Sequence, residues 1–253
     1  AVHDRRGWLL HLVDDLGRRA VGEAAPWPDA GTESAADCGD ALADVCRWLP
    51  GVTPAAALER LPTAAAGPAA RCGVEGALYG LLARHAGQPL HRLLDARASS
   101  TVAVNAACGS ADEELSQRIV AAAAAGFRVF KIKVGVRGWA TELACLRALA
   151  LPPGGTLRLD ANGAWRAADA GRRLADLAGL PVDCVEEPLA TFDPTALAAL
   201  QATVPYALAL DESLAGGAAD LCGPGCPVRR VVLKPMVQGG VRETLARARS
   251  AAA

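Results

Sequence analysis

Five charged residues recur along the second half of the chain, each at the end of a short apolar run. They are Lys133, Asp160, Glu186, Asp211 and Lys234, whose numbers differ by 27, 26, 25 and 23. Three carboxylates brought together repel one another unless a cation lies among them. Because these positions offer oxygen ligands and no His or Cys, the pattern favours a hard ion such as Mg²⁺.

Lysines beside such a metal suit one kind of chemistry, removal of the weakly acidic proton next to a carboxylate. The metal makes this removal feasible because it neutralises the enediolate as negative charge develops. A lysine can act as the base near neutral pH when burial and a nearby cation lower its pKa. The alternative is a row of strand-end charges that only form salt bridges with loops. Five buried charges at regular spacing would be a costly arrangement for that purpose alone.

The elements that position these residues are short apolar runs alternating with alanine-rich helical segments. We predict strands at residues 101–105, 129–134, 156–160, 183–186, 207–211 and 230–234, followed by a helix at 241–253. A capping box at residues 110–113 and a stop at Gly126 delimit the first intervening helix. This rhythm indicates βαβ units and parallel pairing. In a parallel barrel, all the strand-end charges would then lie at the C-terminal rim, where such barrels have their active sites.

The first part of the chain follows a different pattern. Two apolar runs, residues 8–13 and the segment up to residue 21, flank a turn signal at 14–17 and predict a hairpin. Two helices are predicted next, one leading from residue 32 to about 49 and one at 68–85.

The composition places limits on partners. The chain is 52% hydrophobic and 21% charged, and Lys+Arg 26 against Asp+Glu 27 gives a net charge of −1. Bulk charge therefore attracts neither nucleic acid nor an anionic membrane. No apolar run approaches the roughly 20 residues of a membrane span, and the N-terminus does not read as a signal peptide. We expect a cytoplasmic protein with reduced cysteines, and the sequence leaves homo-oligomerisation open.

Five segments closely resemble the muconate-lactonizing subgroup of the enolase superfamily. They are Lys-Ile-Lys at 131–133, Leu-Asp-Ala-Asn-Gly-Ala-Trp at 159–165, Val-Glu-Glu-Pro at 185–188, Leu-Asp-Glu-Ser at 210–213 and Val-Leu-Lys-Pro at 232–235. The resemblance covers nearly the whole chain. Within the subgroup, the Glu-Glu-Pro, Asp-Glu-Ser and Leu-Lys-Pro combination is most similar to the o-succinylbenzoate synthases.

The resemblance implies a fold as well as a site. It implies a (β/α) TIM-type barrel, C-terminally incomplete here, with an N-terminal α+β capping domain. We assign residues 1–98 to the capping domain, whose first strand is mostly missing, and 99–253 to the partial barrel. The last two barrel strands are also missing relative to the family. We therefore expect this sequence to be incomplete relative to the natural gene product, and do not expect it to be active alone.

The resemblance also implies a metal site. Its ligands would be Asp160, Glu186 and Asp211, holding Mg²⁺ with Mn²⁺ as a possible substitute. Enolase-superfamily sites pair such a metal with a Lys or His base. Residues expected to support the ligands from behind are Asn162, Glu187 and Glu212.

Three lysines receive roles in the same way. Lys133 would abstract the α-proton and then protonate the departing hydroxyl on the same face. Lys234 would lie opposite and stabilise the enediolate with its ammonium group. Lys131 would lie beside Lys133 and either set its pKa or touch the substrate carboxylate. For Lys131 and Asn162, ordinary packing behind the site is as good an interpretation as direct contact. Trp165 is interpreted as a packing residue.

The expected function is that of a carbon–oxygen lyase. It would convert a cyclohexadiene carboxylate into o-succinylbenzoate, a step of menaquinone biosynthesis, with this small-molecule carboxylate as its partner. A dipeptide epimerase or N-acylamino acid racemase is the alternative, because two lysines on opposite faces also suit racemisation. The apolar loop around Trp27 suits a hydrophobic substrate. A non-catalytic scaffold is a second alternative, although all five rim residues are present. Nucleotide binding is disfavoured because no glycine-rich phosphate loop occurs.

Overall fold

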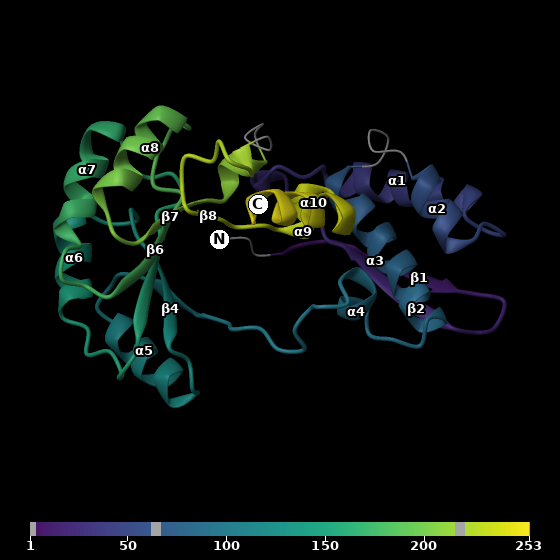
Figure 1. The fold of residues 1–253 in the computed structure, drawn as a ribbon, viewed down its shortest axis with the longest axis horizontal. Coiled ribbons are helices and arrows are strands. Elements are labelled where there is room, and N and C mark those ends of the chain that lie inside the picture. The colour runs from purple at the N-terminus through teal and green to yellow at the C-terminus, as the bar shows by residue number, and fades with distance from the viewer. Residues whose placement is uncertain (1–3, 62–66, 216–220, 253) are drawn as a thin grey trace. The chain divides into compact units, whose positions relative to one another are not determined.

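A computed structural model describes residues 4–61, 67–215 and 221–252. Its contacts divide the chain into two compact units. The N-terminal unit consists of Ala1–Val102 together with Leu233–Ala252, and the sheet unit is formed by Ala103–Val232. In Figure 1, the sheet unit is coloured from teal to green. The predicted domain limits, residues 1–98 and 99–253, stay a prediction.

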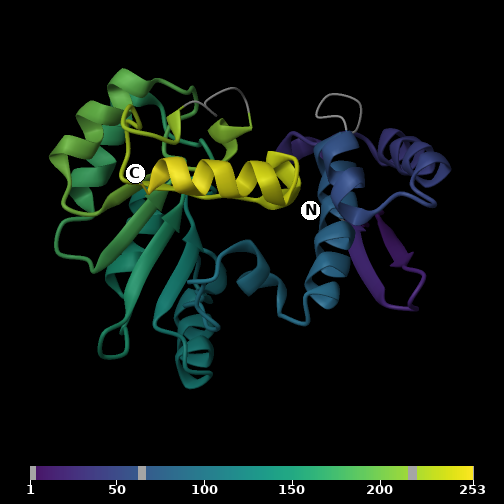
Figure 2. The same ribbon diagram turned by 45° about the vertical axis from the view of Figure 1, so that its right-hand side comes forward.

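The sheet unit contains a six-stranded parallel sheet in sequential order, as predicted. Its strands are β3 (Ala106–Ser110), β4 (Val129–Lys133), β5 (Thr156–Asp160), β6 (Val182–Glu186), β7 (Ala207–Leu210) and β8 (Arg230–Val231). The intervening helices are α5 (Leu115–Ala124), α6 (Trp139–Arg147), α7 (Ala167–Asp176) and α8 (Pro194–Thr203), with a short 3-10 turn η2 (Glu212–Leu214) after β7. Figures 1 and 2 show the four helices along one face of the sheet. This is the (β/α)-barrel arrangement that the sequence predicts.

Alternation along the strands gives the sheet its two faces. Phe130 and Ile132 on β4, and Leu157 and Leu159 on β5, are completely buried. Side chains at the intervening positions point to the opposite face. The register pairs Lys133 with Asp160 and Asp160 with Glu186. The sheet therefore aligns three of the predicted rim residues in one row at the strand ends.

Two predictions at the start of this unit are wrong. Residues 101–105 form no strand, and β3 begins at Ala106 instead. The β-branched run lacks a partner strand, and Val102 and Val104 are exposed. The predicted capping box also does not form, because α5 begins at Leu115 with no side-chain cap. Gly126, with φ +96°, does follow the end of α5 as predicted.

The last two strands are shorter than predicted. β7 ends at Leu210, so Asp211 follows the strand directly, and β8 ends at Val231, so Lys234 lies three residues beyond it. The prediction that Lys234 terminates a strand is therefore wrong. Lys234 instead precedes a short helix that begins at Pro235, whose ring fixes φ at a helical value and favours the first helical position.

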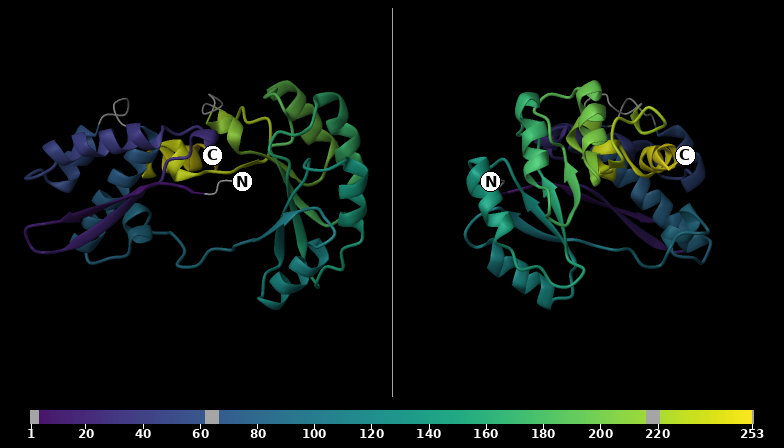
Figure 3. Two further views of the ribbon diagram at one scale, coloured as in Figure 1. Left: turned by 180° about the vertical axis from the view of Figure 1, so that it is seen from behind. Right: turned by 60° about the vertical axis from the view of Figure 1, so that its left-hand side comes forward.

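The N-terminal unit combines the predicted hairpin with helices. Its elements are β1 (Trp8–Val13), β2 (Arg19–Ala24), η1 (Pro28–Ala30), α1 (Ala35–Trp48), α2 (Pro54–Arg60), α3 (Pro68–His85), α4 (Leu90–Leu94), α9 (Pro235–Gln238) and α10 (Val241–Ala251). Figure 3 shows the purple hairpin running alongside α3. Close approach is possible because Gly22 of β2 faces Gly73 of α3, where a Cβ on Gly22 would lie 1.8 Å from the Gly73 carbonyl oxygen.

Two predictions made from composition can be compared with the structure. All eight cysteines are free thiols. In the part of the chain that the structure describes, no helix combines the length and apolar character needed to cross a bilayer.

Candidate active site

The three predicted metal ligands are buried acids on neighbouring strands of the sheet unit. Asp160 ends β5, Glu186 ends β6, and Asp211 follows β7 directly. Their exposed fractions are 3%, 2% and 4%, respectively. A carboxylate that loses its water in this way requires hydrogen bonds or a cation.

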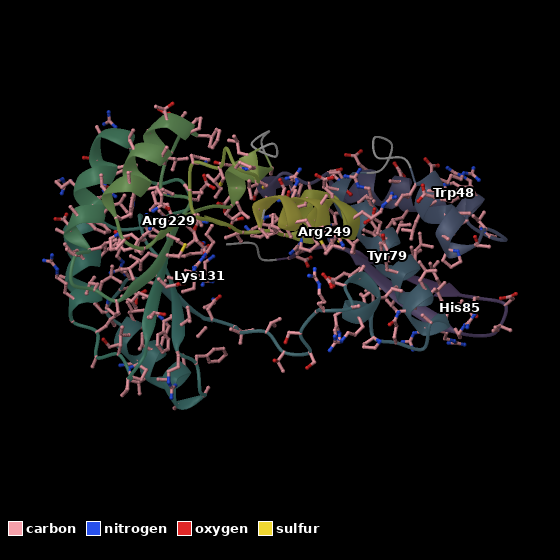
Figure 4. The ribbon with its side chains drawn as sticks, viewed as in Figure 1. Trp48, Tyr79, His85, Lys131, Arg229 and Arg249 are labelled. Carbon is pink, nitrogen blue, oxygen red and sulfur yellow. The ribbon has the colours of Figure 1, made fainter. Side chains whose placement is uncertain are left out.

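Lys131 is the cation that two of these acids share. Its Nζ lies 3.0 Å from Asp160 Oδ2 and also donates to Glu186 Oε2. Lys131 projects from β4 (Figure 4), and its side chain is three-quarters buried. Burial alone would lower the pKa of Lys131, but the hydrogen bonds to Glu186 and Asp160 raise that pKa above its ordinary value. The Lys131 side chain is therefore a charged ammonium group between two carboxylates.

Lys133 lies on the same face of β4, one layer nearer the strand end. Its side chain is half-exposed, and its Nζ lies 3.8 Å from Asp160 Oδ2. The same ammonium donates to Asn162 Oδ1, and Asn162 Nδ2 donates to Glu212 Oε1 at 3.0 Å. Glu212 thus fixes the amide that holds Lys133. The prediction that Asn162 supports the site acquires a physical basis in these two hydrogen bonds.

Glu187 shapes the loop after β7. Its Oε2 accepts the Asp211 N–H at 2.7 Å and the Ser213 N–H at 3.1 Å, and its Oε1 accepts the Ser213 hydroxyl. Glu187 and Asn162 adopt φ values of +41° and +42°, which are uncommon for residues other than glycine. Such backbone strain concentrates at functional sites.

Lys234 belongs to the N-terminal unit. Its carbonyl oxygen accepts the N–H groups of Val237 and Gln238 at 2.9 Å each, as expected for the residue before α9. Its predicted position opposite Lys133 stays a prediction. Within the sheet unit, by contrast, the structure brings Lys131 and Lys133 to the acids.

One charged cluster was not predicted from the sequence. Asp183 Oδ2 accepts hydrogen bonds from Arg158 at 2.6 Å and from Arg230 at 2.7 Å. The hydrogen bond from Arg230 does most to lower the pKa of Asp183; burial opposes it, and Arg158 adds to it. Arg158 Nε also lies 3.9 Å from Glu186 Oε1. Arg158 could have been found from the alternation of β5, because it lies two residues before Asp160.

The chemistry of the acids fits a divalent cation, although their present arrangement does not. Over residues 4–61, 67–215 and 221–252, no three His, Cys, Asp or Glu side chains form a group that could hold a metal ion. Asp160 and Glu186 hold the Lys131 ammonium instead. Three buried carboxylates on successive parallel strands supply the oxygen donors that Mg²⁺ prefers. In this structure, the Lys131 ammonium therefore neutralises part of the negative charge at these strand ends.

Trp165 follows β5 and is completely buried. Its ring meets that of Trp139 edge-on, with centroids 5.4 Å apart and an interplanar angle of 71°. The interpretation of Trp165 as a packing residue is confirmed.

Comparison with known proteins identifies relatives of this chain. The family model described as "Enolase C-terminal domain-like" matches residues 114–253. The o-succinylbenzoate synthase of Thermosynechococcus vestitus is 35% identical over 219 residues, covering 85% of this chain and 62% of the relative. The hydrophobic dipeptide epimerase of Roseobacter litoralis is 30% identical over 241 residues, covering 94% and 70%. The chain thus spans only about three fifths of the first of these relatives.

Solved structures agree on the fold. The L-Ala-D/L-Glu epimerase from Bacillus subtilis superposes with a TM-score of 0.85 at 24% identity, covering 98% of this chain and 73% of that one. The o-succinylbenzoate synthase from Thermosynechococcus elongatus BP-1, solved with magnesium in its active site, gives a TM-score of 0.72 at 33% identity, covering 96% and 72%. Since the family model matches more than half of the chain, the protein belongs to the enolase C-terminal domain-like family of the enolase superfamily.

Proposed function

We propose that the complete protein is a Mg²⁺-dependent o-succinylbenzoate synthase, a lyase of menaquinone biosynthesis. The observation that supports it most is the pair of buried carboxylates, Asp160 and Glu186, side by side at the strand ends with Lys133 beside them. The choice of reaction is supported by the 35% identity to a relative of that name.

The metal ligands in this proposal are Asp160, Glu186 and Asp211, with Mn²⁺ as a substitute ion. When bound, the cation would stabilise the negative charge that develops on the substrate carboxylate. Glu187 has a supporting role: by accepting the Asp211 and Ser213 N–H groups, it holds the loop that carries the third ligand.

Lys133 is the proposed base. Its half-exposed side chain can reach a substrate, while Asn162 and Glu212 restrict where its Nζ lies. In the forward reaction, Lys133 takes the proton from the carbon next to the carboxylate. The C–O bond to the neighbouring hydroxyl then breaks, and the same proton leaves with that oxygen as water. Lys234 would present its ammonium to the opposite face.

The test is an assay of the purified complete protein with the cyclohexadiene precursor, in Mg²⁺ and in EDTA. We expect Mg²⁺-dependent formation of o-succinylbenzoate. Failure of the protein to bind Mg²⁺ in a calorimetric titration would instead favour a non-catalytic scaffold.

A dipeptide epimerase is the second candidate. It is favoured by the relative named hydrophobic dipeptide epimerase, which matches 94% of this chain at 30% identity. Lysines on both faces of the α-carbon would serve that reaction equally well. Assays with hydrophobic dipeptides and N-acylamino acids separate the candidates: turnover of these compounds alone would overturn the synthase proposal.

A further inference from the structure

Buried glutamates in the sheet unit show how this chain stabilises an acid permanently. Glu142 has no exposed surface, and its carboxylate accepts the N–H groups of Gly135, Val136 and Arg137 at 2.8 Å each. These donors are part of the backbone and cannot leave the carboxylate without unfolding the loop. Glu187 is held in the same way by two backbone N–H groups. Both acids are therefore fixed in place.

Asp160 and Glu186 also depend on a side chain, although Asp160 Oδ1 accepts the backbone N–H of Asn162 at 3.1 Å. One oxygen of each, Asp160 Oδ2 and Glu186 Oε2, faces the same Lys131 ammonium. A lysine ammonium is a compact charge on a flexible four-carbon stem, so it can move without any change in the backbone. The pair of acids is thus neutralised in part by a group that can leave.

We propose that Lys131 is a resident counter-cation: it holds Asp160 and Glu186 together in the metal-free protein, and the incoming divalent cation displaces it. This inference rests on the proposed metal site. A divalent cation bound to the same carboxylate oxygens would repel the Lys131 ammonium at such short range, and this repulsion favours displacement of the ammonium. Binding of Mg²⁺ therefore exchanges one cation for another.

The burial of Lys131 shows that such an exchange is feasible. A quarter of its side-chain surface is exposed, whereas that of each acid is exposed by 3–4%. The Lys131 side chain therefore has contact with solvent that the carboxylates lack. Lys133, two residues further along β4, already lies half in solvent and has its own partner in Asn162. Lys133 is accordingly a matched control on the same strand face.

The test compares Mg²⁺ affinity by calorimetry and Tm in EDTA and in saturating MgCl₂. Lys131→Met should lower Tm in EDTA, because two buried carboxylates lose the cation that they share. In saturating Mg²⁺ that Tm difference should largely disappear, and Mg²⁺ should bind about tenfold more tightly or better, because its competitor is gone. Lys131→Arg retains a cationic side chain, so its Tm and its Mg²⁺ affinity should both stay much closer to those of the wild type. Lys133→Met should alter the Mg²⁺ affinity less than Lys131→Met.

Three results would overturn this inference. One is the same loss of Tm for Lys131→Met with and without Mg²⁺, together with unchanged or weaker Mg²⁺ binding. Another, obtained from the wild type alone should the Met variant fail to fold, is a Mg²⁺-bound crystal structure in which Lys131 still bridges Asp160 and Glu186. If the folded wild type binds no Mg²⁺ at all, the proposed metal site itself fails, and this inference fails with it.

Discussion

Buried acids in the two units of the molecule have different partners. In the N-terminal unit, Glu75 of α3 is 2% exposed and accepts hydrogen bonds from the backbone N–H of Arg242 at 3.0 Å and from its Nε at 3.2 Å. In the sheet unit, Asp160 and Glu186 are equally buried but share the ammonium of Lys131. Burial is the same in both regions, so burial alone does not identify a functional acid. The mobility of the partner distinguishes the two.

The carboxylate of Glu75 also packs closely against the turn before α10. A Cβ on Gly240, whose φ is +118°, would lie 2.5 Å from Glu75 Oε2. Nearby, Arg71 Nε donates to the Gly239 carbonyl oxygen and ties the same turn to α3. These contacts join α3 to the start of α10, 167 residues later in the chain. We interpret Glu75 as a structural clasp and the pair of Asp160 and Glu186 as an exchangeable site.

The largest expected effect is the loss of turnover in Lys133→Ala of the complete enzyme. Removal of a general base typically reduces the rate by about 10²–10⁴-fold. Because Lys133 Nζ is 3.8 Å from the nearest ligand oxygen, Mg²⁺ affinity should stay nearly unchanged. Steady-state kinetics and a calorimetric titration on the same preparation check both parts. Near-normal turnover would exclude Lys133 as the base.

A smaller but substantial effect is expected for Glu75→Ala. It removes the buried α3 carboxylate that contacts the start of α10 and should lower the free energy of unfolding by about 2–3 kcal/mol. Because Glu75 is not part of the proposed metal site, saturating Mg²⁺ should not change this loss of unfolding free energy. Urea unfolding with and without MgCl₂ measures it, with Glu75→Gln as the variant of similar shape. If Mg²⁺ abolished the loss of unfolding free energy in Glu75→Ala, the distinction between fixed and exchangeable partners of buried acids would not hold.

The smallest expected effect concerns Asp183, whose partners are the side chains of Arg158 and Arg230. Its pKa in the folded protein is lowered from its ordinary value of 3.8. The contribution of Asp183 to stability is therefore present above about pH 3.8 and is lost as the pH falls through the folded-state pKa. Because the carboxylate is a quarter exposed, we expect Asp183→Asn to destabilise by only about 1 kcal/mol at pH 7.

Unfolding of wild type and Asp183→Asn at pH 7 and near pH 3 tests the sign of this effect. The difference should shrink at the lower pH. Asp169→Asn, which removes the carboxylate of a more exposed ion pair with Arg172, is the control and should change stability less at both pH values. A difference that grows on acidification would contradict the assigned direction of the pKa.

Much of the sheet unit could be predicted because its rhythm is local. The limits of β5, residues 156–160, and of α3, residues 68–85, are those that the apolar pattern predicts. The strand predicted at residues 101–105 does not form, because β-propensity alone cannot supply a partner strand. β8 was predicted too long for a related reason, since only Arg230 and Val231 pair with β7.

The site could be predicted in part. The spacing along the sequence predicted that Lys133, Asp160 and Glu186 lie in one row at the strand ends. The observed register confirms this row. The bridging role of Lys131 was not predicted, because it depends on which way a long side chain turns. Asp183 was missed because the register of β6 shifts by one residue between Val182 and Cys184, and simple alternation fails there.

A crystal structure of the complete protein with Mg²⁺ would show whether the three strand-end acids hold one ion. We expect one carboxylate oxygen from each of Asp160, Glu186 and Asp211 at about 2.0–2.1 Å from the ion, with the Lys131 ammonium displaced. A structure in which the ion lies elsewhere, while those three side chains keep separate surroundings, would contradict it.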